Sequence, residues 1–146
     1  MTAQGNETTV REWFGTWNKR DWETFTTFLT PQTEMLTVAT GEKLSGHEGW
    51  RQVWELWNTA FPAHQLSITK TIADDRGVAV EAVFDGTHSG TFRTPAGDIP
   101  ATGKSVHAAF IGYTQLENGK VSSYHLYFDT LTILTQLGVA PQPQAV

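Results

Sequence analysis

The hydrophobic pattern in the first half of the chain has the period of amphipathic helices. Residues 7–19 carry apolar side chains at positions i, i+3, i+4 and i+7, which share one face of a helix. These side chains are Val10, Trp13, Phe14 and Trp17. Residues 21–30 predict a shorter helix, with Asp21 as its N-cap and Pro31 closing it. A strand rich in Thr and Val is expected over residues 33–40.

Residues 45–61 predict a third helix with a long apolar stripe. Ser45 and Glu48 have the S-x-x-E spacing of a capping box, in which each side chain accepts a hydrogen bond from a backbone N–H at the helix start. The stripe that follows consists of Trp50, Val53, Trp54, Trp57 and Phe61. Pro62 comes directly after this stripe and ends the helix.

Beyond Pro62 the hydrophobic period becomes that of β-strands. Helices followed by strands and tight turns predict a single α+β domain over residues 1–146. We expect a curved, mostly antiparallel sheet with the three helices of the N-terminal half on its concave face, an ordered core over 7–138 and a loose C-terminal tail. A bend or bulge is expected at Gly86 and Gly90. The predicted elements are strands over 66–73, 78–93, 104–116 and 120–129 and a short helix over 130–137.

The composition excludes several kinds of partner and chemistry. Hydrophobic residues make up 39% and charged residues 17% of the chain, a balance typical of a globular domain. The formal net charge is -5 and no run of Lys and Arg exists to neutralise phosphates, so nucleic acid is not an expected partner. The chain has no cysteine, and its five histidines lack metal-ligand spacing, so we expect no metal site.

The chain shows no sign of a membrane segment. No apolar run approaches the roughly 20 residues that span a bilayer. The polar N-terminus also lacks the apolar core of a signal peptide. We therefore expect a cytoplasmic protein without a membrane partner.

The aromatic content is the unusual feature of the composition. Six Trp, eight Phe and three Tyr favour a cavity with flat walls for a small, largely apolar molecule, although core packing is the simpler explanation of each Trp alone. Trp17 on the first helix, with Trp54 and Trp57 on the third, are the candidate walls. His88, in Gly-Thr-His-Ser-Gly, is a further candidate contact, with a role in the strand bend as the alternative.

The Asn118-Gly119 turn between the last two strands can be interpreted in two ways. A two-residue type I′ turn pairs Glu117 with Lys120, whereas a three-residue loop pairs Leu116 with Lys120. The difference of one residue changes which side chains share a face of the sheet. We favour the three-residue loop, because it collects polar groups on one face and leaves the other nearly apolar.

With that register, we expect the face of mixed polarity to form the floor of the cavity. Asp129 then lies opposite His107, with His125, Tyr113 and Tyr127 as neighbouring hydrogen-bonding groups. The apolar face would serve packing or a dimer contact. It consists of Val106, Ala108, Phe110, Gly112, Tyr124, Leu126 and Phe128.

Six short segments, in order along the chain, point to a known family. They are Ser-Gly-His-Glu-Gly (45–49), Ala-Phe-Pro (60–62), Asp-Gly-Thr-His-Ser-Gly (85–90), Ala-Thr-Gly-Lys (101–104), Glu-Asn-Gly-Lys (117–120) and Phe-Asp-Thr-Leu-Thr-Ile-Leu-Thr-Gln-Leu-Gly (128–138). Together they resemble the SnoaL-like polyketide cyclase family over about residues 8–138. The family belongs to the nuclear transport factor 2-like superfamily, so the resemblance implies a cone-shaped half-barrel with a deep pocket.

The resemblance also implies a reaction. Characterised cyclases of the family close a ring of an aromatic polyketide by intramolecular aldol condensation, without metal or cofactor, and their general acid/base matches Asp129. A buried carboxylate has a raised pKa and can act as the base. Nearby donors that would stabilise the enolate are His107, His125, Tyr113 or Tyr127. Asp129 also stands where a strand gives way to a helix, so it would serve equally as an N-cap.

Two other functions stay open. A dehydratase or isomerase of the same superfamily would depend on His107 or His125 instead of Asp129. A non-catalytic module that binds a small ligand would need none of the three. The apolar face of the sheet predicts at least a homodimer.

Overall fold

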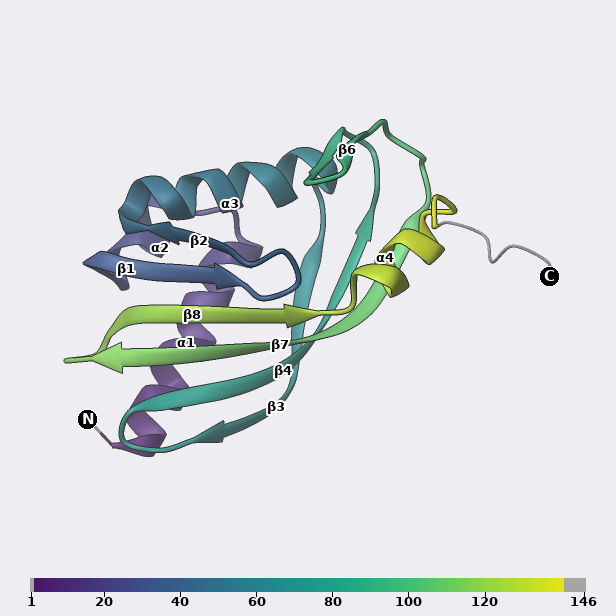
Figure 1. The fold of residues 1–146 in the computed structure, drawn as a ribbon. Helices are drawn as coiled ribbons and strands as arrows, with labels where there is room; N and C mark the ends of the chain where they lie inside the picture. The colour runs from purple at the N-terminus through teal and green to yellow at the C-terminus, as the bar shows by residue number, and fades with distance from the viewer. Residues whose placement is uncertain (1, 141–146) are drawn as a thin grey trace.

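Three helices lie on one side of a long, curved sheet in the computed structural model, which describes residues 2–140 (Figure 1). The helices are α1 (Ala3–Asn18), α2 (Trp22–Thr27) and α3 (Gly46–Ala60), and a fourth, α4 (Thr130–Gln136), follows the last strand. The strands are β1 (Leu29–Thr37), β2 (Glu42–Ser45), β3 (Gln65–Ala73), β4 (Gly77–Thr87), β5 (Phe92–Thr94), β6 (Gly97–Ile99), β7 (Ser105–Glu117) and β8 (Lys120–Phe128).

Six of the strands form one sheet in the order β2-β1-β8-β7-β4-β3, and β5 pairs with β6 in a separate hairpin. Every pair in the large sheet is antiparallel except β1 with β8. Because β2 and β3 remain as edges, the sheet is a half-barrel and does not close. This confirms the predicted α+β class with α1, α2 and α3 on the concave face. The part of the predicted tail over residues 141–146 lies outside the described residues.

The helix starts differ from the predictions in their capping. Helix α1 begins earlier than expected, with the Thr2 hydroxyl accepting from Gly5 N–H. Ser45 is the N-cap of α3, as predicted, but its side chain makes no cap hydrogen bond, so the capping box is wrong. Ser45 is also the last residue of β2 and pairs with Glu34. Gly46, at a φ of 72°, turns the chain directly from that strand into the helix.

Two predicted strands have different bounds in the structure. Strand β1 starts at Leu29 and contains Pro31, so α2 ends before the proline instead of at it. The long strand expected over 78–93 breaks after β4, because the backbone N–H groups of Ser89 and Gly90 donate to the carbonyl of Ala60. A Cβ at Gly90 would lie 2.0 Å from the Thr59 carbonyl oxygen, so only glycine permits this approach to α3.

The β7–β8 hairpin combines the two registers considered for it. Glu117 pairs with Lys120 across a turn in which Asn118 and Gly119 have φ values of 51° and 75°, so the three-residue loop is wrong. A register shift follows, and from Gln115 opposite Ser123 onward the pairing is one residue further along. Odd-numbered residues therefore share a face with odd-numbered ones, as predicted.

The end of this hairpin corrects one predicted contact. Pairing of β7 with β8 ends at Phe110 opposite Phe128, so Asp129 does not lie opposite His107. The side chain of Gln136 on α4 takes the place of a strand there. It accepts from His107 N–H at 2.7 Å and donates to the His107 carbonyl at 2.9 Å.

Candidate functional site

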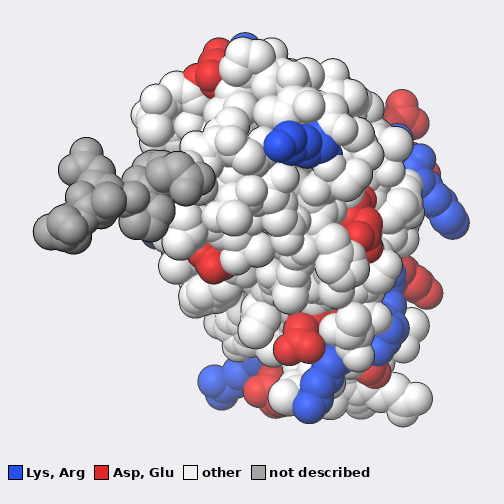
Figure 2. Space-filling model, turned by 90° about the vertical axis from the view of Figure 1, so that its right-hand side faces the viewer, with Lys and Arg blue, Asp and Glu red and all other residues white. Residues whose placement is uncertain are grey.

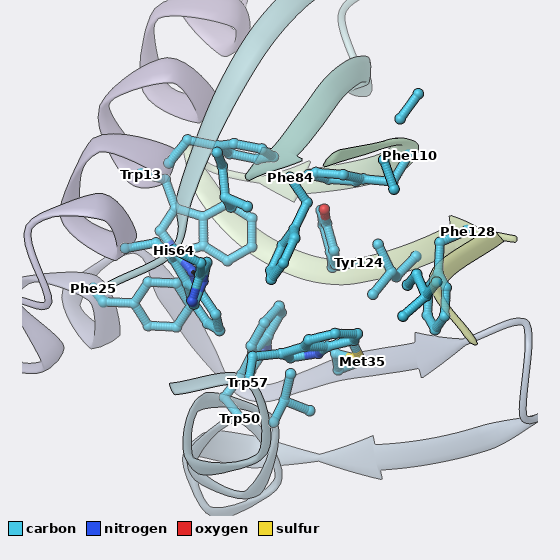
Figure 3. Close-up of a pocket in the computed structure, with 18 residues that line it drawn as sticks. Trp13, Phe25, Met35, Trp50, Trp57, His64, Phe84, Phe110, Tyr124 and Phe128 are labelled. Carbon is cyan, nitrogen blue, oxygen red and sulfur yellow. Dashed lines mark hydrogen bonds between the residues drawn. The ribbon is translucent and has the colours of Figure 1, made fainter. Parts of the chain in front are cut away.

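A cavity of about 80 Å³ lies inside the cone, between the helices and the concave face of the sheet (Figure 3). The indoles of Trp13 and Trp17 reach it from α1, and those of Trp50 and Trp57 from α3. Phe84, Phe110, Tyr124, Leu126 and Phe128 form the opposite wall on strands β4, β7 and β8. The lining is almost entirely apolar, and it contains no carboxylate, lysine or arginine among the described residues.

The prediction that the mixed face lines the cavity is wrong. The cavity uses the apolar face, with Ala108 and Phe110 on β7 and Tyr124 on β8. The physical reason is the pattern of the helices themselves: the aromatic stripes of α1 and α3 need an apolar surface to pack on, and burial of unpaired ionisable groups beneath them would be costly. The face expected to serve packing or a dimer contact is therefore covered by the protein's own helices.

The residues predicted to form the cavity floor lie on the outer, convex face. His107 has a side chain that is 75% exposed, and its Nδ1 contacts the carboxylate of Asp85 on β4. His125 Nε2 lies 3.6 Å from a Glu34 carboxylate oxygen. Tyr127 is 46% exposed. Tyr113, half-buried on the same face, is the fourth, and none of the four is among the described residues that line the cavity.

Asp129 is exposed and caps α4. Its carboxylate accepts from Leu131 N–H at 3.1 Å and from the Thr132 hydroxyl at 2.7 Å. The hydrogen bond from Thr132 contributes most to a pKa below the ordinary value, which is opposite to the raised pKa that the sequence led us to expect. Asp129 also borders a shallow surface hollow that it shares with Phe110 and Phe128, two residues that line the cavity.

Of the three tryptophans and His88, which were predicted to contact the ligand, only two tryptophans line the cavity. Trp17 and Trp57 line the cavity, as predicted, whereas Trp54 does not. Trp54 packs behind them, with its ring 4.9 Å from that of Trp17. His88 is fully buried but lies outside the cavity lining. Its Nδ1 accepts from the backbone N–H of Thr102 at 3.1 Å, which fastens the two ends of the segment that carries β5 and β6.

Two polar residues in the cavity wall were missed by sequence reasoning. His64 stacks on Phe84 with ring centroids 4.8 Å apart, and its Nε2 accepts from the Trp17 indole N–H at 2.7 Å. Because an indole nitrogen only donates, the His64 proton must be on Nδ1, which donates to the Phe61 carbonyl at 2.7 Å. Burial lowers the pKa of His64 to about 4, so the ring is neutral near pH 7.

Tyr124 is the second missed residue. The sequence places it on the face expected to serve packing or a dimer contact, because the other residues of that face are apolar. Burial raises the pKa of its phenol above the ordinary value, so this group is a neutral hydroxyl in the cavity wall. No sequence signal separates it from Tyr113 or Tyr127; only the choice of sheet face does.

The size of the cavity limits what it holds in this conformation. A dry cavity of roughly 150 Å³ is known to accept benzene, whereas the present one is about 80 Å³. The indoles fill much of the cone. Even a ligand with a single aromatic ring, and more so a polycyclic one, therefore requires side chains or α4 to move outward, since Ile133 of α4 forms part of the wall.

The charges and metal-ligand groups add no competing site. The described residues contain no group of three or more His, Cys, Asp and Glu side chains placed to hold a metal ion. At the end of the molecule where α4 lies, charged side chains are scattered over a mostly uncharged surface (Figure 2). Within residues 2–140 no helix has the length and apolarity to cross a bilayer.

Solved structures with the same fold cover nearly the whole chain. A candidate SnoaL-like polyketide cyclase from Jannaschia sp. CCS1 is 20% identical, with a TM-score of 0.85 over 97% of this chain and 96% of the other. AclR, a candidate hydroxylase from Streptomyces galilaeus, is 20% identical, with a TM-score of 0.82 over 97% and 89%.

A third structure, a protein with a ketosteroid isomerase-like fold from Catenulispora acidiphila in complex with trimethylamine, is 18% identical, with a TM-score of 0.74 over 91% and 93%. At these identities the likeness concerns the fold alone, and the names range from cyclase to hydroxylase. No curated protein matches the sequence significantly.

The family assignment comes from the sequence. The family model for SnoaL-like polyketide cyclase matches residues 7–137, which include every element from α2 to α4 and most of α1. The cone-shaped sheet, the helices on its concave face and the apolar cavity between them agree with that match. The chain therefore belongs to the SnoaL-like polyketide cyclase family.

Proposed function

We propose that this protein binds a small, largely apolar molecule inside the cone. The observation that carries the proposal is the cavity itself, which four indoles and the apolar face of the sheet enclose. Apolar surface transferred from water to such a site contributes roughly 25 cal/mol per Å². Flat aromatic walls favour a planar ligand, because rings stack or meet edge to face on them.

The test uses the indole N–H signals of the six tryptophans in a two-dimensional 15N NMR spectrum. Acetophenone, a small planar ketone, should shift the signals of the cavity tryptophans on titration. Ala108→Phe should abolish these shifts, because Ala108 is buried in the cavity wall and a phenyl group there would fill the space.

The matched control is Ala79→Phe on the outer face of β4, which should bind acetophenone as the unmodified protein does. Overpacking in the cavity is expected to cost about 1–3 kcal/mol of stability, so the fold of Ala108→Phe is checked by its spectrum without ligand. Equal shifts in both variants would place the binding site elsewhere.

Family membership favours a second function, cofactor-free ring closure or isomerisation. The specific observation in its favour is that Asp129 borders the same surface hollow as Phe110 and Phe128, two residues that also belong to the cavity wall. A ligand that extends from the cavity past Phe110 and Phe128 into this hollow would bring a carbon atom close to the carboxylate. The first step of aldol chemistry is removal of a proton from a carbon beside a carbonyl, which a carboxylate base can perform.

The catalytic role of Asp129 is testable without the natural substrate. The protein should accelerate exchange of the acetophenone methyl protons with deuterium oxide, measured by proton NMR. Asp129→Asn should reduce the exchange rate roughly a hundredfold or more with little loss of stability, because Asn also caps helices.

Asp129→Ala separates the two roles of this residue. It should lose the exchange activity and also about 1 kcal/mol of stability, because the cap of α4 disappears. Full exchange activity in Asp129→Asn would show that Asp129 is a cap alone and would leave ligand binding as the function.

A further inference from the structure

The hydroxyl of Tyr124 is a hydrogen-bond donor inside an apolar wall. The ring is held firmly, with centroids 5.4 Å from Trp13 and 5.6 Å from Trp50. No hydrogen bond joins the hydroxyl to another of the described residues, although the residue is only 6% exposed. A buried hydroxyl without a partner is costly, so a group of this kind in a native structure calls for an explanation.

The backbone of β7 makes room for this hydroxyl. A Cβ atom on Gly112 would lie 2.1 Å from the Tyr124 oxygen and 2.5 Å from the ring carbon that carries it. Any other residue at position 112 would therefore displace the phenol. Tyr124 lies across this glycine, and its hydroxyl points toward Phe84 and Phe110 (Figure 3).

The hydroxyl is not enclosed as completely as the indole nitrogens of Trp13 and Trp50, and its residue lines the cavity. The Nε1 atoms of Trp13 and Trp50 are buried out of reach of water, and they have no hydrogen-bond partner among the described residues. The Tyr124 oxygen is not sealed in this way, and its residue belongs to the cavity wall. His64, the other polar wall residue, already uses both ring nitrogens.

We propose that the Tyr124 hydroxyl, placed over Gly112, donates a hydrogen bond to a carbonyl oxygen of the ligand. This rests on the proposed ligand-binding function and narrows it: the cavity selects a planar ketone over a hydrocarbon of the same shape. The phenol is suited to this task, because burial keeps it protonated at neutral pH. A hydrogen bond to the carbonyl oxygen would also stabilise negative charge that develops there when a neighbouring carbon loses a proton.

The test compares two probes of nearly equal shape. Acetophenone carries a C=O group where α-methylstyrene carries C=CH2, so only the ketone accepts a hydrogen bond. The unmodified protein should bind acetophenone about tenfold more tightly than α-methylstyrene, the difference expected for one buried hydrogen bond. Tyr124→Phe removes only the hydroxyl oxygen and should bind the two probes about equally.

Thermal stability and infrared spectra separate this role from a structural one. Tyr124→Phe should melt at the same temperature as the unmodified protein or slightly higher, because the lost hydroxyl has no protein partner. In the unmodified protein, the C=O stretch of bound 13C-labelled acetophenone should lie at a lower frequency than that of acetophenone dissolved in hexane, and this shift should be absent in the variant. This measurement reports on the hydrogen bond even if the variant folds poorly.

The outcomes distinguish the inference from the proposed function. Binding of both probes with equal affinity to the unmodified protein, or an unchanged preference in Tyr124→Phe, would overturn the role of Tyr124 and leave ligand binding intact. Failure of both probes to bind the unmodified protein would overturn the proposed function and the inference with it.

Discussion

At the scale of single residues, the environment of His64 shows how the fold changes the chemistry of a side chain. The ring is fully buried, accepts from Trp17 and donates to the Phe61 carbonyl. Burial is the main cause of its lowered pKa, and the nearby positive charge of Arg20 acts in the same direction. The guanidinium of Arg20 also donates to the carbonyl of Pro62 at 3.1 Å, which holds the segment that carries His64.

The depressed pKa of His64 predicts a stability that depends on pH. The pKa falls from 6.5 when the chain is unfolded to about 4 when it is folded. Between these values the unfolded chain binds more protons, so stability falls as the pH falls through this window. The loss approaches about 3 kcal/mol near the lower end. His88, whose pKa is also lowered by burial, acts in the same direction.

Urea unfolding at pH values from 7.5 down to 4.5 measures this effect. His64→Gln should flatten the dependence, because the amide oxygen still accepts from Trp17 but the side chain does not titrate. The control is His47→Gln at an exposed position in the first turn of α3, and its dependence should match that of the unmodified protein. An unchanged slope in His64→Gln would contradict the assignment.

At the scale of elements, the helices were predictable and the ends of strands were not. The stripe of α3 is visible in the sequence because the 3.6-residue period repeats over four turns. The end of β4 depends on how Gly90 approaches the carbonyl of Thr59, a contact between segments some thirty positions apart. Local pattern carries no information about such a contact.

The β7–β8 hairpin shows the same limit in a sharper form. The Asn118-Gly119 sequence is typical of a type I′ turn, and the structure has the corresponding two-residue turn. The polarity of the strands, which favoured a three-residue loop, nevertheless predicted correctly which residues share a face. The turn and the division of faces are compatible because a register shift near Gln115 moves the strand pairing by one residue. Helix α4 then replaces β8 beside His107, through the side chain of Gln136.

At the scale of the whole molecule, the homodimer stays a prediction. The helices cover the face first expected to form the dimer contact, so we now expect the contact on the outer face of the sheet. Ile72, Ile111 and Tyr127 are 67%, 44% and 46% exposed there. Size-exclusion chromatography with light scattering should give the mass of a dimer, and Ile111→Glu should give a monomer, because a charge would be buried in the contact.

The control for this prediction lies on α4. Leu131 is 60% exposed but does not belong to the sheet, so Leu131→Glu should remain a dimer. A monomer for the unmodified protein, or a dimer for Ile111→Glu, would remove the outer face as the contact.

The sequence by itself determined the α+β class, the three amphipathic helices, the division of the hairpin into a mixed and an apolar face, and the family. These are properties of local periodicity and of short motifs. Only the tertiary structure decided which face of the sheet encloses the cavity. As a result, Tyr124 and His64 line the cavity wall, and His107, His125 and Asp129 lie outside it. Alternation along a strand defines two faces but does not name the inner one; the aromatic stripes of the helices select it, because they are buried only against the apolar face.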